Sequence, residues 1–138
     1  MVFDLCFKSY TMEDKKIHLL VVEDDEFLVK MYESGLTKEG FDVTTAGNGE
    51  EGLQKAGEIK PDLILLDLIM PKMDGFTCLE KLKEDNAIKR IPVVILSNLG
   101  QDSDIKRGME MGAEGYLIKT DFTVKQVAEK VRKILGIN

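Results

Sequence analysis

The segment DLILLDLIMPKMDG, residues 62–75, decides the fold because it joins a short apolar run to an aspartate and a proline-broken loop. The run LILLD at 63–67 is short enough to be one strand, and it is apolar at every position before the acid. Strands that are apolar on both faces are typical of parallel sheets covered by helices on both sides. Asp67 therefore stands where a buried strand is expected to end.

Four more apolar runs along the chain are short enough to be strands. They are IHLLVV (17–22), FDVTTA (41–46), IPVVILS (91–97) and GYLIK (115–119). Stretches with helical periodicity separate these runs, and the alternation predicts an α/β fold. We expect a doubly wound five-stranded parallel sheet with helices on both faces, of the flavodoxin-like type with strand order 2-1-3-4-5.

Two of the helical stretches have a defined apolar face. After the first strand, the residues expected to share one face are Phe27, Leu28, Met31, Tyr32 and Leu36. Gly40 is expected to end this helix just before the second strand. Near residue 138 a second set recurs at spacings of three and four, which predicts a helix packed on the core; its members are Val124, Val127, Val131 and Ile134.

The size of the chain predicts a single domain. Its 138 residues, 43% of them hydrophobic, suffice for one core and are too few for two ordinary domains. We expect residues 15–138 to form this domain and residues 1–14 to be a flexible N-terminal extension. The first eleven residues lack the basic start and apolar stretch of a secretory signal, and one hypothesis is that Met12 is the native start.

Charge and cysteine content argue against several classes of function. The net charge of -6 is unfavourable for a nucleic acid or an anionic membrane as the main partner. No apolar run approaches the roughly 18 residues that would span a bilayer. Cys6 and Cys78 are far apart and form no zinc-binding pattern, which fits a reducing cytosol. We therefore expect a cytoplasmic protein with neither a nucleic-acid nor a membrane partner.

Polar side chains mark the ends of four of the expected strands. The first strand is followed by Glu23 and Asp24, the third ends in Asp67, the fourth in Ser97 and the fifth in Lys119. In open α/β sheets, binding sites form beyond the carboxyl ends of the strands, where the strand order reverses. The sequence thus predicts that these acids, the hydroxyl and the amine converge at one edge.

Converging carboxylates predict a metal site. Two of them about 5 Å apart repel by roughly 3 kcal/mol at an effective dielectric constant near 20. A hard divalent cation removes this repulsion, and oxygen ligands suit Mg²⁺, or Mn²⁺, better than zinc. We expect Asp24 and Asp67 to bind the metal directly and Glu23 to bind it directly or through water, and the backbone carbonyl of Ile69 could complete the protein's share.

A metal held in this way can neutralise an incoming phosphoryl group, and a carboxylate can attack a phosphoryl donor placed in line with it. The expected product is an acyl phosphate on Asp67. Lys119 and Ser97 would then each contact one phosphoryl oxygen.

Four segments, VVEDDE, LLDLIMPKMDG, VVILSN and GYLIKT, resemble the signature segments of the response-regulator receiver domain of two-component signalling. They occur in the same order and on the same strand ends, and the resemblance covers about residues 15–137. The roles it implies are phosphoacceptor for Asp67, metal-site acid for Glu23 and Asp24, phosphate-contacting lysine for Lys119, switch hydroxyl for Ser97 and switch aromatic for Tyr116.

The resemblance also implies a mode of signalling. A stand-alone, CheY-like receiver would accept the phosphoryl group from a histidine kinase or histidine phosphotransfer protein that docks beside the first helix. Phosphorylation would draw Ser97 and its loop toward the phosphate, turn Tyr116 inward and remodel the face of the fourth helix, fifth strand and fifth helix. An unknown downstream protein would bind this face. Such a chain catalyses only its own phosphorylation and dephosphorylation and is not a turnover enzyme.

Several of these residues also have simpler structural explanations. Asp25 is expected to cap the first helix, and Asp24 could share that role. Asp67 could close a turn, and Ser97 could merely end a strand. Tyr116 could be an ordinary core residue.

The same architecture can also carry other functions. A phosphorylation-independent pseudo-receiver that only binds a partner is the main alternative. A flavodoxin would need a phosphate loop where residues 23–26 are all acidic, and a dehydrogenase would need GxGxxG there. A haloacid-dehalogenase-type phosphatase would need a second acid where Ile69 stands.

Three positions depart from the receiver pattern. Thr120 follows Lys119 where proline is common, which makes a cis peptide less assured. Asn98 follows Ser97 where a small residue is usual. Ile69 occupies a position that is often polar, where its side chain could hinder the water that hydrolyses the acyl phosphate, so we expect slow loss of phosphate.

Overall fold

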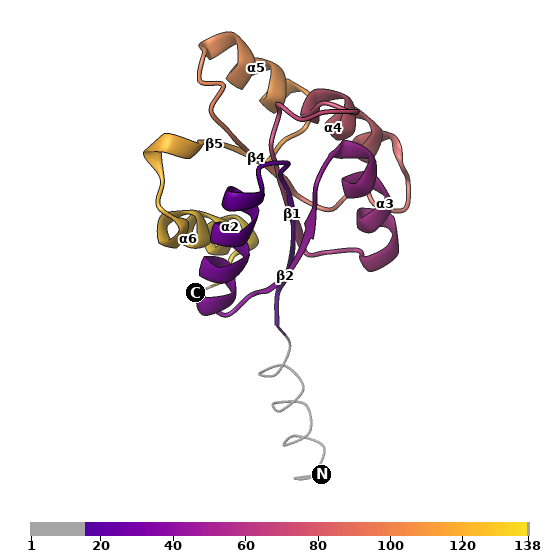
Figure 1. Ribbon diagram of the computed structural model, residues 1–138. Coiled ribbons are helices and arrows are strands. Elements are labelled where there is room, and N and C mark those ends of the chain that lie inside the picture. Colours follow the sequence, from indigo (N-terminus) through magenta and orange to yellow (C-terminus); the bar gives the residue numbers. More distant parts are fainter. Residues whose placement is uncertain (1–15, 138) are drawn as a thin grey trace, which may run out of the picture.

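The computed structural model describes residues 16–137, so the expectations for residues 1–14 and for Met12 as the native start lie outside the described residues. Helices and strands alternate along the described chain (Figure 1). In chain order they are β1 (His18–Val22), α2 (Glu26–Lys38), β2 (Asp42–Ala46), α3 (Gly49–Ile59), β3 (Leu63–Leu66), α4 (Gly75–Glu84), β4 (Val93–Ser97), α5 (Asp102–Glu110), β5 (Gly115–Ile118), the 3-10 turn η1 (Lys119–Asp121) and α6 (Val124–Leu135).

The five strands form one parallel sheet in the order β2-β1-β3-β4-β5, which confirms the predicted fold and strand order. The register brings the carboxyl ends of the strands to one edge. Val22 of β1 pairs with Leu66 of β3, and Ser97 of β4 pairs with Ile118 of β5. The residues that follow β1 and β3 therefore leave the sheet side by side, and those that follow β5 leave the same edge on the far side of β4.

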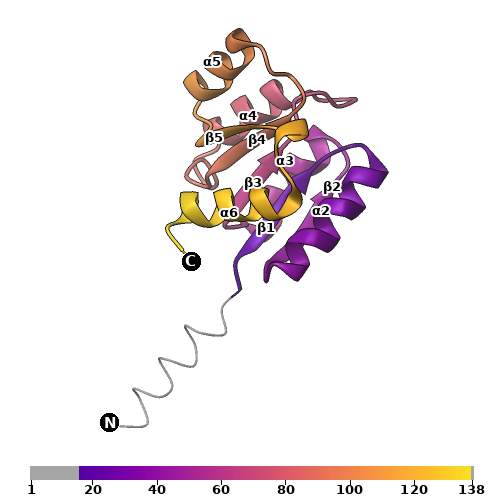
Figure 2. The ribbon, with the colours of Figure 1, turned by 90° about the vertical axis from the view of Figure 1, so that its left-hand side faces the viewer.

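Two apolar cores lie on opposite faces of the sheet. On β1, Leu19 and Val21 belong to the core that α2 and α6 cover, whereas Leu20 and Val22 belong to the core that α3 and α4 cover. Figures 1 and 2 show α2 and α6 on one side of the sheet and α3 and α4 on the other. Strands β3 and β4 are buried along their whole length, as expected for central strands covered on both faces.

The predicted apolar face of α2 is only partly correct. Tyr32 and Leu36 are buried and Leu28 is half-buried, but Phe27 is 75% exposed and Met31 is 37% exposed. Leu28, Tyr32 and Leu36 recur every four residues and form one row that faces the sheet. Phe27 and Met31 each precede a member of this row, which turns them about 100° around the helix. Both therefore lie at the exposed edge of the predicted apolar face, on one flank of α2.

The predicted end of α2 and the predicted last helix are confirmed. Gly40 follows α2 with a φ of 99°, a left-handed conformation that favours glycine. On α6, Val127 and Val131 are buried, and Val124 and Ile134 are half-buried against the same core.

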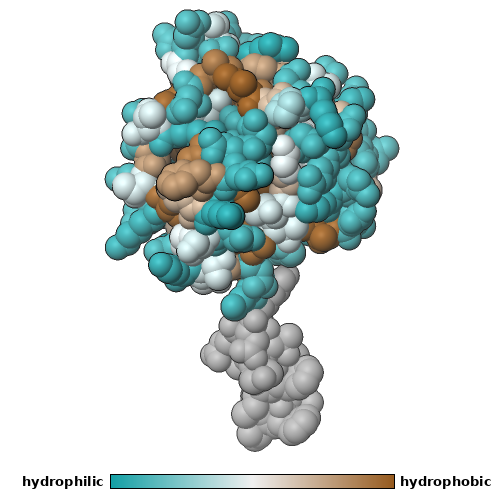
Figure 3. Space-filling view, viewed as in Figure 1, coloured by the Kyte–Doolittle hydropathy of each residue, from teal (hydrophilic) through white to brown (hydrophobic). Residues whose placement is uncertain are grey.

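The outer surface is dominated by polar residues. Figure 3 shows one face of the molecule as mainly hydrophilic, with small separate apolar areas. The large apolar residues that are exposed on the described chain are Phe27 and Met31, both on α2, and Ile69, Met109 and Ile137 elsewhere. Among residues 16–137, no helix combines the length and the apolar character needed to cross a bilayer.

Candidate functional site

Three carboxylates meet at the carboxyl edge of the sheet. Glu23 follows β1 and Asp67 follows β3, and both side chains are buried, whereas Asp24 is exposed. Each of the three offers one oxygen that lies within 4.8 Å of the other two. The spacing and the all-oxygen chemistry fit a hard divalent cation such as Mg²⁺, with the exposed side of Asp24 leaving room for water. The Ile69 carbonyl as a further ligand stays a prediction.

Lys119 joins two of these acids to β5. It begins η1 directly after that strand, and its ammonium group donates a hydrogen bond to Glu23 Oε1. The same Lys119 Nζ lies 3.2 Å from Asp67 Oδ2. The lysine side chain is only 10% exposed. The predicted convergence of the strand ends therefore places a nearly dehydrated amine against the two buried carboxylates.

Burial and charge act in opposite directions on the Glu23–Lys119 pair. Burial raises the pKa of Glu23, and the hydrogen bond from Lys119 only partly offsets this, while the nearby charge of Asp67 adds to the rise. Burial alone would lower the pKa of Lys119, but the hydrogen bond to Glu23 and the charge of Asp67 outweigh it, so the pKa of Lys119 is raised. The lysine therefore remains charged at neutral pH.

The backbone around Asp67 fixes the orientation of its side chain. Asp67 Oδ1 accepts the Leu68 N–H at 2.8 Å, and the Asp67 N–H donates to the Val22 carbonyl at 3.0 Å. Helix α4 begins against this loop at Gly75, where an added Cβ would lie 2.2 Å from the Asp67 carbonyl oxygen. A side chain at position 75 would thus push the start of α4 away from Asp67, which explains the glycine.

Ser97 and Tyr116 are linked through the main chain of one residue, Leu99, in the loop after β4. Ser97 is fully buried, and its hydroxyl oxygen accepts the Leu99 N–H at 3.3 Å. The Tyr116 hydroxyl donates to the Leu99 carbonyl at 2.5 Å, and its half-buried ring packs against the core under α3 and α4. The two residues predicted to switch are therefore coupled by hydrogen bonds to the same residue.

The three departures from the receiver pattern lie around the site. Ile69 is 60% exposed, and its N–H is 3.5 Å from Asp67 Oδ1. Asn98 is exposed, so its effect on the entrance stays a prediction. The residues 16–137 contain no cis peptide bond, and the bond before Thr120 is therefore trans.

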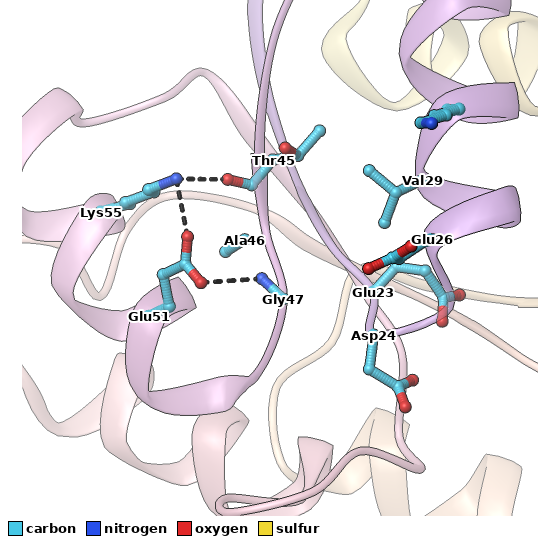
Figure 4. Close-up of a pocket in the computed structure, with 10 residues that line it drawn as sticks. Glu23, Asp24, Glu26, Val29, Thr45, Ala46, Gly47, Glu51 and Lys55 are labelled. Carbon is cyan, nitrogen blue, oxygen red and sulfur yellow. Dashed lines mark hydrogen bonds and ion pairs between the residues drawn. The ribbon is translucent and has the colours of Figure 1, made fainter.

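An open cleft of about 490 Å³ adjoins the acids between α2 and α3. Figure 4 shows Glu23, Asp24 and Glu26 on one side of it and Glu51 with Lys55 on the other. Lys55 Nζ forms an ion pair with Glu51 at 2.8 Å and donates a hydrogen bond to the Thr45 carbonyl oxygen. These two contacts fix the side of the cleft that Glu51 and Lys55 form, its second wall. The hydrogen bond from Lys55 and a second from the Gly47 N–H also hold the pKa of Glu51 below its usual range.

Sequence reasoning did not find this second wall. The acids, the hydroxyl and the amine predicted for the site all lie at strand ends, whereas Glu51 and Lys55 lie on α3. Their spacing of four residues, with the acid first, is a recognisable helical ion pair and was the available signal. Asp25 behaves as expected, since its carboxylate caps α2 by accepting the N–H groups of Phe27 and Leu28.

With this geometry in place, comparison with known proteins identifies the family. The family model described as "Response regulator receiver domain" matches residues 19–132. The chain belongs to the response-regulator receiver family. Receiver domains of this family are the phosphorylation modules of two-component signalling.

Relatives of the chain include multidomain regulators. The DNA-binding dual master transcriptional regulator RpaA of Synechocystis sp. is 38% identical over 117 residues, which are 85% of this chain and 48% of that protein. Response regulator PleD of Caulobacter vibrioides is 45% identical over 101 residues, or 73% of this chain and 22% of that protein. The chain thus spans less than half the length of these curated relatives.

Solved receiver structures share the whole fold. The chemotaxis protein CheY4 of Vibrio cholerae has a TM-score of 0.81 and 27% identity, covering 87% of this chain and 99% of that one. CheY in the CheX-CheY-BeF3-Mg complex of Borrelia burgdorferi has a TM-score of 0.80 and 33% identity, covering 86% of this chain and 89% of that one.

We expect Asp24→Asn to raise the melting temperature of the metal-free protein and to abolish the further rise that Mg²⁺ produces in the wild type. The substitution removes one of three crowded negative charges and at the same time one metal ligand. A ligand that binds only the native state raises its apparent stability. Thermal melts with and without Mg²⁺ measure both effects.

The matched control is Asp25→Asn, one residue along the chain. Asparagine caps helices about as well as aspartate, and Asp25 is not one of the three clustered acids. This variant should keep the Mg²⁺ response of the wild type. A full Mg²⁺ response in Asp24→Asn would contradict the assignment of Asp24 as a ligand.

Proposed function

We propose that this receiver accepts a phosphoryl group on Asp67 in a reaction that depends on Mg²⁺ and signals through the resulting change of its surface. One observation carries the proposal: Lys119 contacts buried Glu23 and buried Asp67 beside the exposed Asp24. A purely structural role does not explain this cluster, because burying the like charges of Glu23 and Asp67 is costly and such clusters of titratable groups are typical of functional sites.

The transfer joins one Asp67 carboxylate oxygen to the phosphorus of the donor. The bond from phosphorus to the donor nitrogen or oxygen breaks, and the leaving group keeps its electron pair. Glu23, Asp24 and Asp67 would hold Mg²⁺, whose positive charge would offset the negative charge of the phosphoryl oxygens. The Lys119 ammonium stabilises another phosphoryl oxygen, and the Ser97 hydroxyl donates to a third after it leaves the Leu99 N–H.

A small-molecule donor tests the chemistry without any partner protein. We expect acetyl phosphate with Mg²⁺ to add one phosphoryl group to the wild-type chain, and chelation of Mg²⁺ to prevent it. Asp67→Asn removes the nucleophile and should remain unlabelled. Intact-mass spectrometry detects the added group.

Asp42→Asn is the control, because Asp42 is an exposed aspartate at the opposite end of the sheet. It should be labelled like the wild type. Labelling of Asp67→Asn at full yield would contradict the proposal. An unlabelled wild type would favour the alternative, a pseudo-receiver that binds its partner without phosphorylation.

We also expect the acyl phosphate to be long-lived, because Ile69 is an exposed apolar side chain two residues from the acceptor. It offers no group to orient the hydrolytic water and obstructs its approach. Ile69→Asn should therefore shorten the half-life of the phosphorylated protein, followed by intact mass after removal of the donor. Rapid loss of phosphate in the wild type, unchanged by this substitution, would contradict the expectation.

A histidine kinase or histidine phosphotransfer protein is the proposed donor, and the exposed flank of α2 is its proposed docking surface. Phe27 and Met31 lie on this flank in the first two turns after the acids, and Phe27 is 75% exposed. A large apolar residue beside a reactive site is typical of a protein interface anchor. A partner seated there can bring its phosphohistidine to Asp67.

Phe27→Ala separates docking from chemistry. Transfer from a phosphorylated histidine kinase of the same organism should slow by about tenfold, equivalent to ~1.4 kcal/mol. The rate with acetyl phosphate should not change, because that donor needs no docking surface. Ile137→Ala, which removes an exposed apolar residue from the end of the chain, is the control. An equal loss with both donors would place the defect in the site and contradict the docking role.

The proposed output surface is the face of α5, β5 and α6, which corresponds to the fourth helix, fifth strand and fifth helix of the sequence prediction. Its physical connection to the acceptor is the main chain of Leu99, whose N–H donates to the Ser97 hydroxyl and whose carbonyl accepts from the Tyr116 hydroxyl. When Ser97 turns to the phosphoryl group, Leu99 loses a partner and the loop before α5 is free to move. The downstream protein binds the face of α5, β5 and α6 after this movement.

A further inference from the structure

The peptide between Ala46 and Gly47 is held from both sides. Its carbonyl oxygen accepts the Glu23 N–H at 2.9 Å, and its N–H donates to Glu51 Oε2 at 3.1 Å (Figure 4). The carbonyl and the N–H of a trans peptide point in opposite directions, so the peptide stands between the end of β1 and helix α3. One peptide therefore connects the carboxylate of Glu51 to the main chain of Glu23.

Lys55 completes the arrangement on α3. Its ammonium group forms the ion pair with Glu51 and donates to the Thr45 carbonyl oxygen at 2.6 Å. The two side chains thus hold two successive peptides at the end of β2. This strand lies at the edge of the sheet, with β1 as its one neighbour. On the side away from β1, Glu51 and Lys55 provide the hydrogen bonds that a further strand would make.

Charge strengthens this line of hydrogen bonds. A hydrogen bond to an ionised acceptor is roughly twice as strong as one between neutral groups. A peptide that donates to a carboxylate also becomes a better acceptor at its carbonyl, because hydrogen bonds in a chain polarise one another. Glu51 stays ionised at neutral pH, since the bonds from Lys55 and Gly47 lower its pKa. The Ala46 carbonyl is therefore a strong acceptor for the Glu23 N–H.

The position of Glu23 matters because several groups of the site depend on it. Glu23 Oε1 accepts the hydrogen bond from Lys119, and Oε2 accepts the Asp25 N–H at 3.1 Å. Glu23 is also one of the three clustered acids. A shift of its main chain would change the spacing of the carboxylates and of the amine together. Removal of a group that orients a metal ligand generally weakens metal binding by about 10- to 100-fold.

We propose that Glu51 and Lys55 are a positioning pair for the metal site and act on Glu23 through the Ala46–Gly47 peptide. The inference rests on the proposed binding of Mg²⁺ by the three clustered acids. The pair fixes the end of β2, and the end of β2 in turn fixes the main chain of Glu23. Neither side chain of the pair has to contact the metal.

An effect of charge alone is the alternative, and it predicts opposite results for the two residues. Removing the negative charge of Glu51 would weaken the binding of a divalent cation, whereas removing the positive charge of Lys55 would strengthen it. Loss of positioning weakens binding in both cases, because either substitution loosens the end of β2. The direction of the change in a Lys55 variant therefore separates positioning from charge.

Calorimetric titration of the full chain with Mg²⁺ tests the pair. Glu51→Ala should bind Mg²⁺ about tenfold more weakly than the wild type, the low end of the range for orienting groups, because Glu51 acts through an intervening peptide. Lys55→Ala should also bind more weakly, by a smaller factor. Glu51→Gln should lose less affinity than Glu51→Ala, because its amide oxygen can still accept the Gly47 N–H. Both side chains are partly exposed on a helix, where alanine is well tolerated.

Lys30→Ala is the matched control for charge. Lys30 is an exposed lysine on α2 that lines the same cleft from the opposite side. Its replacement removes the same positive charge as Lys55→Ala but leaves the end of β2 as it is. This variant should bind Mg²⁺ at least as tightly as the wild type.

Amide hydrogen exchange of the metal-free protein provides a second readout. In Glu51→Ala the Glu23 amide should exchange faster than in the wild type, because its acceptor is less firmly held. The Asp67 amide is the internal reference, since it donates to the Val22 carbonyl on the side of β1 that faces β3. Its exchange should not change.

The positioning role would be overturned by wild-type affinity in Glu51→Ala, by equal losses in Glu51→Gln and Glu51→Ala, or by tighter binding in Lys55→Ala. A similar loss in Lys30→Ala would also overturn it. So would an unchanged Glu23 amide, or equal acceleration of the Glu23 and Asp67 amides, which indicates general destabilisation. Failure of the underlying metal site is a different result, because the wild type itself would then not bind Mg²⁺.

Discussion

The geometry of the site depends on the contact between Lys119 and two buried carboxylates. Removing one member of a buried ion pair generally costs about 3 to 5 kcal/mol, because the remaining charge is left without compensation. Here the lysine comes from the end of β5, and its partners come from the ends of β3 and β1. Its side chain therefore reaches past β4, where the small and fully buried Ser97 ends the strand. One ammonium group thus links the ends of three strands, β1, β3 and β5, at one edge of the sheet.

This arrangement also explains why a domain with so charged an edge folds. The two apolar cores stabilise the sheet from both faces, and β3 and β4 contribute only apolar residues and Ser97 to them. The packing of these two cores thus offsets the unfavourable free energy of gathering the acids at the edge of the sheet. The acids at this edge are therefore not needed for the stability of the fold, which leaves them available for the proposed binding of a cation and a phosphoryl group.

Much of the fold could be predicted because its determinants are local. Each central strand is a short run of apolar residues, and the parallel order follows from the helices between them. The position of the acids and of Lys119 followed from the rule that strand ends share an edge. The apolar face predicted for α2 did not reveal which of its five residues are buried, because the sheet covers only the row of Leu28, Tyr32 and Leu36. Contacts between helices, such as Arg107 with Phe76 or the wall of Glu51 and Lys55, depend on lateral packing that no local pattern encodes.

The link between Ser97 and Tyr116 runs through the main chain of Leu99. Main-chain groups are present whatever amino acid occupies a position, proline's missing N–H apart. Both hydrogen bonds are therefore insensitive to the identity of the side chain at position 99. The half-buried Leu99 side chain packs against the core, so another apolar residue that fills the same space would leave both hydrogen bonds in place.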